Sequence, residues 1–159
     1  MDNLIFLKLG GSLITDKERP RTARLDKLKE LAVEVRSALA RDPNLRLLIG
    51  HGSGSFGHVG AKKYGTRDGL SGSDDEYWHG FTEVGHEAAA LNRIVMGALR
   101  EAKLPALAIS PSGCVTAQDG EVKIWDLSPI ESALRKGVIP VVYGDVVLDA
   151  MHGGTILST

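Results

Sequence analysis

The amino-acid sequence predicts an α/β fold in which a mostly parallel central sheet is flanked by helices and carries β-hairpins at its periphery. Short, nearly continuous apolar runs alternate along the chain with longer stretches whose apolar residues recur every three or four positions. Runs of the first kind indicate strands buried on both faces, and stretches of the second kind indicate amphipathic helices. Glycine supplies 19 of the 159 residues, and two of its clusters directly follow apolar runs.

The first half of the chain is predicted to contain two strands and two helices. The expected elements are a strand over residues 4–9, a helix over 25–39, a strand over 45–49, and a helix that follows a loop over 65–72 and runs to residue 99. Gly10 and Gly11 end the first strand, and a polar segment over residues 15–24 separates it from the first helix. Residues 73–76 have the Ser-x-x-Glu form of a capping box, which typically begins a helix.

The second half alternates in the same way and adds two hairpins. The expected elements are a strand over residues 106–109, a hairpin of 115–117 with 122–125, a helix from 128 to 136, a strand over 138–143 and a closing hairpin of 146–148 with 155–157. Asp119-Gly120 is a hairpin-turn signal. Ser128 as the cap, Pro129 at the first helical position and Gly137 just past the end delimit the helix.

Composition and charge exclude several classes of protein. A formal net charge of −1 gives no overall attraction to nucleic acid or to an anionic membrane. The apolar run at the N-terminus is too short to span a bilayer and lacks the layout of a signal peptide. Cys114 has no partner for an intrachain disulfide, and His79, His86 and His152 lack metal-ligand spacing. We therefore expect a cytoplasmic protein with no metal site formed by its side chains and no nucleic-acid or membrane partner.

The first glycine cluster, Lys8-Leu9-Gly10-Gly11-Ser12, stands at the end of a strand. Two glycines allow backbone N–H groups to approach a ligand closely, and a run of such donors forms an anion-binding concavity. A lysine in a buried strand is costly unless it faces an anion. Taken alone, however, these residues fit a plain turn beside a surface lysine equally well.

The second glycine cluster, residues 50–58, follows a buried strand, which is where α/β sheets bind ligands. Its sequence is neither a dinucleotide-binding fingerprint nor a P-loop. The imidazole of His58 can donate to a phosphate oxygen, although a lone loop histidine more often has no such role. Lys17 alone fits a solvated surface charge. Asp145, after the fourth strand, fits an organiser of a lysine or a turn cap equally well.

Together these features resemble isopentenyl phosphate kinase, a member of the amino acid kinase superfamily. The resemblance rests on residues 8–12, on Asp16-Lys17 and on the loop over 50–58. It continues through residues 61–64, 105–112 and 138–147. The first cluster is shared across the superfamily, whereas the histidine that ends the second loop is missing from relatives that phosphorylate carboxylates. The resemblance implies the αβα sandwich of the amino acid kinases.

The resemblance also implies roles for the matched residues. The phosphate of the nucleotide would be bound by Lys8, Gly10, Gly11, Ser12 and Lys17. The phosphate of the acceptor would be bound by Gly52, Ser53, Gly54, Gly57 and His58. Lys8, Lys17 and His58 would be catalytic by neutralising charge as the phosphoryl group passes between oxygens. Ser53 stands where family members often carry glycine, and the acceptor's apolar tail would lie against the helix from Val84 onward.

The resemblance further implies ATP and Mg²⁺ as cofactors, a small-molecule phosphate as substrate and a homodimer. In the superfamily the adenine and ribose bind a C-terminal half. We therefore expect residues 1–159 to form the N-terminal phosphate-acceptor domain, without the nucleotide-binding domain, and to be inactive alone. The alternatives are a fosfomycin-type phosphonate kinase, another amino acid kinase family member, or a non-catalytic phosphate-binding or dimerisation fragment.

Overall fold

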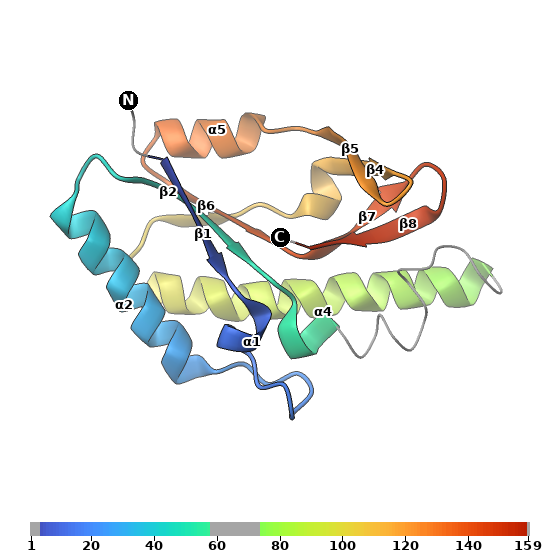
Figure 1. The fold of residues 1–159 in the computed structure, drawn as a ribbon, viewed down its shortest axis with the longest axis horizontal. Coiled ribbons are helices and arrows are strands. Elements are labelled where there is room, and N and C mark those ends of the chain that lie inside the picture. Colours follow the sequence, from blue (N-terminus) through green and yellow to red (C-terminus); the bar gives the residue numbers. More distant parts are fainter. Residues whose placement is uncertain (1–3, 58–73, 159) are drawn as a thin grey trace.

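The computed structural model describes residues 4–57 and 74–158, and Figure 1 shows how their elements are arranged. In chain order these are β1 (Leu4–Leu9), α1 (Gly11–Ile14), α2 (Leu25–Arg41), β2 (Arg46–His51), α4 (Asp74–Glu101), β3 (Ala106–Ala108), a 3₁₀ turn (Pro111–Gly113), β4 (Val115–Gln118), β5 (Glu121–Trp125), α5 (Ser128–Arg135), β6 (Ile139–Tyr143), β7 (Asp145–Asp149) and β8 (Gly153–Leu157).

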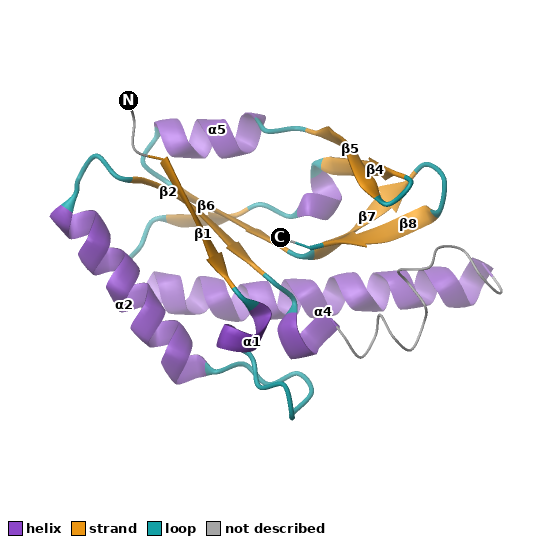
Figure 2. Ribbon diagram, viewed as in Figure 1, coloured by secondary structure: helices purple, strands orange, loops and turns teal. Residues whose placement is uncertain are grey.

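The larger sheet consists of four parallel strands in the order β1-β2-β6-β3. Helices α2 and α4 cover one of its faces, and α5 covers the other (Figures 1 and 2). Alternation along the strands explains the two layers, because Ile49 and Val141 pack toward α2 and α4 while Val142 packs toward α5. The predicted α/β architecture with a mostly parallel sheet is confirmed.

The main core lies between this sheet and the two long helices. Ile49, Leu91 and Val141 have no exposed surface there. The apolar stripe of α2 enters the same core through Leu28, Ala32 and Val35. These positions follow the three- and four-residue spacing that the sequence shows, so the burial of one stripe stabilises the helix where its intrinsic propensity alone would not.

The prediction that residues 4–9 are buried on both faces is wrong. Strand β1 is an edge strand, and Leu4, Ile5 and Phe6 are 54%, 45% and 56% exposed. Strand β6, with a neighbour on each side, is buried along its whole length. An apolar run indicates a strand that packs against other parts of the protein, but it does not indicate whether a second strand lies on each side of it.

A second sheet, in the order β5-β4-β7-β8, contains both predicted hairpins. Asp119 and Gly120 form the turn of the first hairpin with φ angles of 57° and 76°. Two consecutive left-handed residues are what a type I′ turn requires, and Asp-Gly suits them. Gly144 lies at the point where the chain leaves β6 in one sheet and enters β7 in the other.

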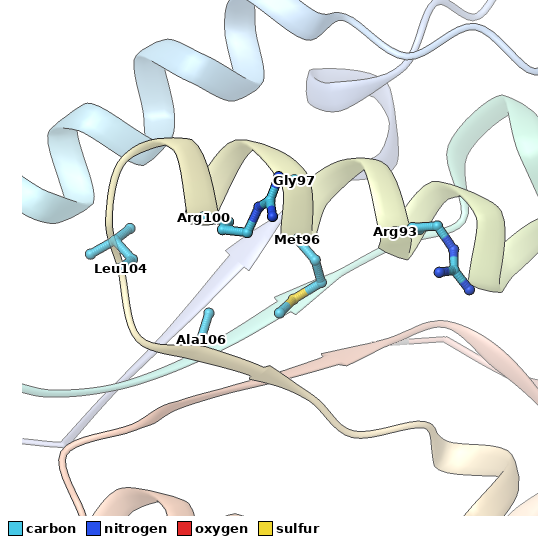
Figure 3. A pocket seen from close by; sticks show the side chains of 6 residues that line it. All are labelled: Arg93, Met96, Gly97, Arg100, Leu104 and Ala106. Atoms are coloured by element: carbon cyan, nitrogen blue, oxygen red, sulfur yellow. The ribbon is translucent and has the colours of Figure 1, made fainter.

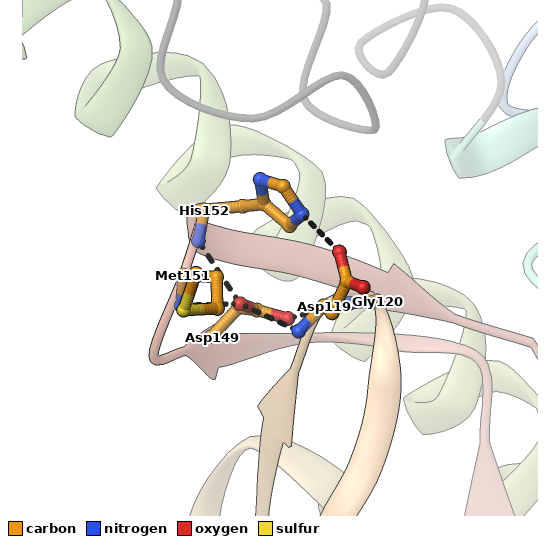
Figure 4. Close-up of polar contacts among 5 residues, drawn as sticks. All are labelled: Asp119, Gly120, Asp149, Met151 and His152. Carbon is orange, nitrogen blue, oxygen red and sulfur yellow. Dashed lines mark hydrogen bonds and ion pairs between the residues drawn. The ribbon is translucent and has the colours of Figure 1, made fainter.

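The carboxylate of Asp149 joins the tips of the two hairpins (Figure 4). It accepts hydrogen bonds from the backbone N–H groups of Asp119, Gly120, Met151 and His152 at 2.8–3.3 Å. Burial of this carboxyl group raises its pKa, but the four donors outweigh burial and hold the pKa at about 2. The ionised Asp149 side chain therefore links the turn of the β4–β5 hairpin to the turn of the β7–β8 hairpin; we call this link the staple.

The start of α5 differs by one residue from the prediction. Leu127 is the cap residue, and Ser128 is already helical and makes no capping hydrogen bond with its side chain. Asp126 does that work instead, because its carboxylate accepts the Ser128 N–H at 2.9 Å. Gly137, with φ of 69°, follows the end of α5 as predicted. The predicted loop over 65–72 and the predicted cap Ser73 lie outside the described residues.

Candidate phosphate-binding site

The two glycine clusters meet at the carboxyl ends of β1 and β2. These strands are parallel neighbours, with Leu9 beside His51. The N–H of Gly52 donates to the carbonyl of Leu9 at 3.3 Å. A Cβ on Gly11 would lie 2.7 Å from the backbone of Gly54, so the two turns are in contact without side chains between them. We call residues 10–12 and 52–54 the glycine cradle.

Thr15 clamps the two halves of the cradle together. Its hydroxyl donates to the Gly11 carbonyl at 2.7 Å and accepts the Ser55 N–H at 3.0 Å. The side chain is fully buried, and a Cβ on Gly54 would lie 2.2 Å from its oxygen. Gly54 also has φ of +51°, so both backbone conformation and space require glycine. Sequence reasoning missed Thr15, which stands at the edge of a polar segment and matches no motif.

The cradle presents backbone donors that have no protein acceptor. Helix α1 begins at Gly11 immediately after β1, a short element that the sequence did not predict. Within residues 4–57 and 74–158, no hydrogen bond is formed by the N–H groups of Gly11, Ser12, Ser53 or Gly54. Unpaired N–H groups of two touching turns at the carboxyl edge of a parallel sheet are suited to binding an anion.

Two lysines flank these donors. Lys8 stands on β1 two positions before the cradle, and Lys17 follows α1; both residues are exposed. Neither forms an ion pair within the described part of the chain. Arg21 ties the Lys17 loop to its surroundings, because its backbone N–H donates to the Ser55 carbonyl and its guanidinium pairs with the buried Glu87 of α4.

Three further residues assigned by the resemblance differ in what the structure shows of them. Gly10 has open space where a Cβ would stand, so packing does not require glycine there. At Gly57 a Cβ would lie 2.6 Å from the Ser53 hydroxyl, so this glycine serves the internal packing of the loop. His58, on which the resemblance placed acceptor recognition, lies outside the described residues.

Asp145 is buried beside the cradle and holds the 3₁₀ turn. Its carboxylate accepts the Ser110 hydroxyl at 2.9 Å, the Ser112 N–H at 3.3 Å and its neighbour Val146 N–H at 2.9 Å. Ser110 and Ser112 belong to the 3₁₀ turn and its cap, and Val146 is in β7. No lysine is bonded to this carboxylate in the part of the chain that the structure describes. Of the two roles that the sequence left open, this geometry favours that of a turn anchor.

His51 is a buried histidine that the sequence prediction did not single out. Its Nδ1 lies 3.1 Å from the Gly52 carbonyl oxygen and its Nε2 lies 3.1 Å from the Asn92 side-chain oxygen. The ring stacks on Tyr143, with centroids 5.5 Å apart. Burial lowers the pKa of His51 below its usual 6.5, so the ring is neutral at pH 7.

An apolar cluster lies between α4 and the β7–β8 hairpin. It consists of Phe81, Val84 and Val146, with Trp78 and Ile156 packed against them. Close backbone approach holds it together, since a Cβ on Gly85 would lie 2.8 Å from the Val146 side chain. The cluster contains Val84, where the resemblance placed the start of the acceptor-tail surface, together with Val146 and Ile156 of the hairpin.

A hollow of about 360 Å³ lies against the C-terminal half of α4 (Figure 3). It is lined by Arg93, Met96, Gly97, Arg100, Leu104 and Ala106. Ala106 begins β3, so this hollow is at the amino end of the sheet, away from the edge where the cradle lies. Among the described residues, no cluster of three or more metal-ligating side chains occurs, and none of the helices could cross a membrane.

Comparison with known proteins relates the whole chain to one family. The model of the amino acid kinase family matches residues 3–158. The chain is 34% identical to isopentenyl phosphate kinase of Methanocaldococcus jannaschii over 159 residues, covering 98% of this chain and 60% of that protein. It is 39% identical to isopentenyl phosphate kinase of Methanothermobacter thermautotrophicus over 151 residues, covering 92% and 55%. The chain thus spans less than two thirds of these relatives.

Solved structures agree with this relationship. A structure of isopentenyl phosphate kinase superposes with a TM-score of 0.90 at 36% identity, covering 98% of this chain and 63% of that one. A substrate complex of isopentenyl phosphate kinase gives a TM-score of 0.80 at 29% identity. Aspartate kinase from Synechocystis, at a TM-score of 0.63 and 14% identity, shares the fold alone.

Proposed function

The chain belongs to the amino acid kinase family, and on that premise we propose that this protein acts in the transfer of the terminal phosphoryl group of ATP to isopentenyl phosphate, which yields isopentenyl diphosphate and ADP. One observation carries the proposal most directly. Two glycine turns from neighbouring parallel strands touch through their backbones. Within residues 4–57 and 74–158, N–H groups of both turns have no acceptor and the two flanking lysines form no ion pair. Such a site suits a reaction in which two anions must be brought together.

The proposed chemistry is a displacement at phosphorus. An oxygen of the acceptor phosphate forms a bond to the terminal phosphorus of ATP while the bond to the ADP oxygen breaks. An ionised phosphate is already a nucleophile, so no general base is needed. Lys8 and Lys17 would neutralise the charge on the group in transit, and the N–H groups of Gly11 and Ser12 would bind it. Gly10 belongs to the same turn.

On the acceptor side we assign the second half of the cradle. Ser53 and Gly54 would donate backbone N–H groups to the acceptor phosphate, with Gly52 and Gly57 shaping the loop and His58 donating from its imidazole. The isoprenoid tail would lie against the apolar cluster of Phe81, Val84 and Val146. A phosphate head and a short apolar tail would thus be matched by the cradle and by the apolar cluster.

Several finer assignments belong to the same proposal. Residues 1–159 would be the phosphate-acceptor domain, and a nucleotide-binding domain would supply the adenine and ribose contacts. The described residues gather no carboxylate set that could hold Mg²⁺ by itself. Mg²⁺ fits this site only as a companion of the ATP phosphates. A homodimer and a cytoplasmic location remain predictions.

Calorimetry of the 159-residue chain tests the binding part of the proposal. We expect isopentenyl phosphate to bind and ATP to bind much more weakly, because these residues would contact only the transferred phosphate of ATP and not its adenine or ribose. Fosfomycin is the comparison ligand, since it offers a phosphonate without the isoprenoid tail. Tighter binding of fosfomycin would favour a phosphonate kinase. An absence of binding by any phosphate or phosphonate would contradict the proposed function.

A further inference from the structure

His51 connects the cradle to two elements of the core, and the proposed phosphoryl transfer gives it no task. It is the last residue of β2, directly precedes Gly52, and has no exposed surface. Its ring contacts the Gly52 carbonyl, the Asn92 side chain of α4 and the ring of Tyr143 on β6. Burying an imidazole is costly, so these partners must compensate for the lost water.

The partners of the ring select one tautomer. A carbonyl oxygen only accepts hydrogen bonds, so Nδ1 must carry the hydrogen that bonds to Gly52. A neutral ring protonated on Nδ1 is an acceptor at Nε2. Asn92 must therefore present an N–H of its side-chain amide to Nε2, with the amide nitrogen in the place of its oxygen. In this arrangement Asn92 of helix α4 keeps the hydrogen of the His51 ring on Nδ1, where it bonds to Gly52 of the cradle.

The bond to Gly52 also fixes the direction of the next N–H. A trans peptide unit is planar, so its C=O and N–H point in opposite directions. Because the Gly52 carbonyl faces the His51 ring, the N–H of Ser53 points away from that ring. Within the described residues this N–H has no acceptor. Gly144 leaves it uncrowded, since even a Cβ there would stand 3.7 Å from the Ser53 nitrogen.

We propose that His51 is a positioning residue that fixes the Gly52 peptide so that the Ser53 N–H faces the bound phosphate, and that Asn92 fixes the tautomer required for this. The inference rests on the proposed phosphate-binding role of the cradle and deepens it. It links that role to α4, the helix that also carries Phe81 and Val84 of the apolar cluster.

Nitrogen-15 NMR of the 159-residue chain reads the tautomer directly. We expect His51 to show a protonated Nδ1 and an unprotonated Nε2 at pH 7.5. Replacing Asn92 by Ala removes the donor to Nε2, and we expect a mixture of tautomers in that variant. A wild-type ring protonated on Nε2 would overturn the inference, whatever the affinity for phosphate.

Two isosteric variants separate the contacts of the ring. His51→Asn keeps an amide N–H near the position of Nδ1 and can still bond to Gly52, whereas His51→Gln places its amide near Nε2 and cannot. We expect His51→Gln to weaken binding of inorganic phosphate and of isopentenyl phosphate by about tenfold, the effect of one lost hydrogen bond. We expect His51→Asn to stay within about threefold of the wild type.

Val95→Ala is the matched control. Val95 is buried on the same helix, one turn from Asn92, and is not one of the three partners of the ring named above. We expect this variant to lose thermal stability without losing phosphate affinity. Equal losses of affinity in His51→Asn, His51→Gln and Val95→Ala would reduce His51 to a general packing role and overturn the inference. If the wild type binds isopentenyl phosphate no better than inorganic phosphate, the proposed function fails while the tautomer and the variant pair still decide the role of His51.

Discussion

Gly11 and Gly54 are the residues on which the contact between the two turns depends. A Cβ on Gly11 would lie 2.7 Å from the Gly54 backbone, a distance that real Cβ atoms essentially never show, and backbone atoms cannot move aside as a side-chain end can. The contact between the two turns of the cradle thus requires that Gly11 carry no Cβ. Gly10, one residue earlier, has open space in the same direction.

Gly11→Ala tests this contact. We expect it to push the two turns apart, to lower the free energy of unfolding by about 1–3 kcal/mol through overpacking, and to abolish measurable phosphate binding. Gly10→Ala is the control, with an expected change within about 0.5 kcal/mol, as at other unconstrained surface positions. Urea denaturation and phosphate titration measure both variants. Equal effects of the two substitutions would show that the backbone contact is not what forms the site.

The buried ring of His51 makes stability depend on pH. Burial lowers its pKa in the folded state, so the unfolded chain binds a proton more readily below pH 6.5. The resulting loss of folding stability is absent well above pH 6.5. It grows as the pH falls, until the pKa of His51 in the folded state is reached. We expect wild-type stability to fall by up to about 1.4 kcal/mol per pH unit in that window from this group. Chemical denaturation of wild type and His51→Gln at several pH values measures the difference, and identical pH slopes would contradict it.

At the scale of elements, the sheet edge and the hairpin tips are positioned by polar contacts that no pattern in the sequence announces. Thr15 joins the β1 and β2 turns, Asp145 holds the 3₁₀ turn, and Asp149 holds both hairpins. Each is a short polar side chain that satisfies backbone N–H or C=O groups where regular structure stops.

Asp149→Ala tests the staple between the hairpins. Four backbone N–H groups lose their acceptor, so we expect cooperative unfolding at markedly lower denaturant and faster amide exchange in β4 and β7. Asp119→Asn is the control, because Asn also suits the type I′ turn and the exposed pair with His152 contributes little. A carbon-13 titration of the Asp149 carboxyl should give a pKa of about 2. Its stabilising effect, complete above pH 3.8, should be lost as the pH falls from 3.8 toward 2, and a titration near 3.8 would contradict the staple.

The elements were largely predictable from the sequence, whereas their contacts were not. Periodicity located both long helices and every strand, and Asp-Gly located the first hairpin, because these signals are local. The exposure of β1 was not predictable, since an edge strand and a central strand share one composition. The same holds for His51 and Thr15, whose partners Asn92 and Ser55 lie 41 and 40 positions away.

At the scale of the whole molecule, the site is built at one corner of the larger sheet. Both cradle turns and Gly144 follow strands of that sheet, and the apolar cluster lies where the second sheet meets α4. The alignment with a relative from Methanocaldococcus jannaschii covers 98% of this chain but only 60% of that relative. The described residues contain the glycine cradle and the apolar cluster.

We therefore expect negligible kinase turnover from the 159-residue chain alone, despite binding of isopentenyl phosphate. A coupled assay for ADP, with ATP and isopentenyl phosphate both present, measures this. Adding the remaining part of a relative, as a longer chain carrying these 159 residues, should restore turnover. ATP-dependent formation of isopentenyl diphosphate by the short chain would contradict the assignment of the adenine and ribose contacts to a further domain.

The edge position of β1 has a consequence for the site itself. Among the described residues β1 has β2 as its single strand neighbour, so alternate N–H groups along its outer edge have no strand to bond to. Half of the cradle is thus attached to a strand whose amide hydrogens should exchange with solvent quickly, and half to β2, which lies between two neighbours. The two halves of the anion site should differ in how often they open, and a bound phosphate, by bridging them, should slow exchange on the Gly11 side far more than on the Gly52 side.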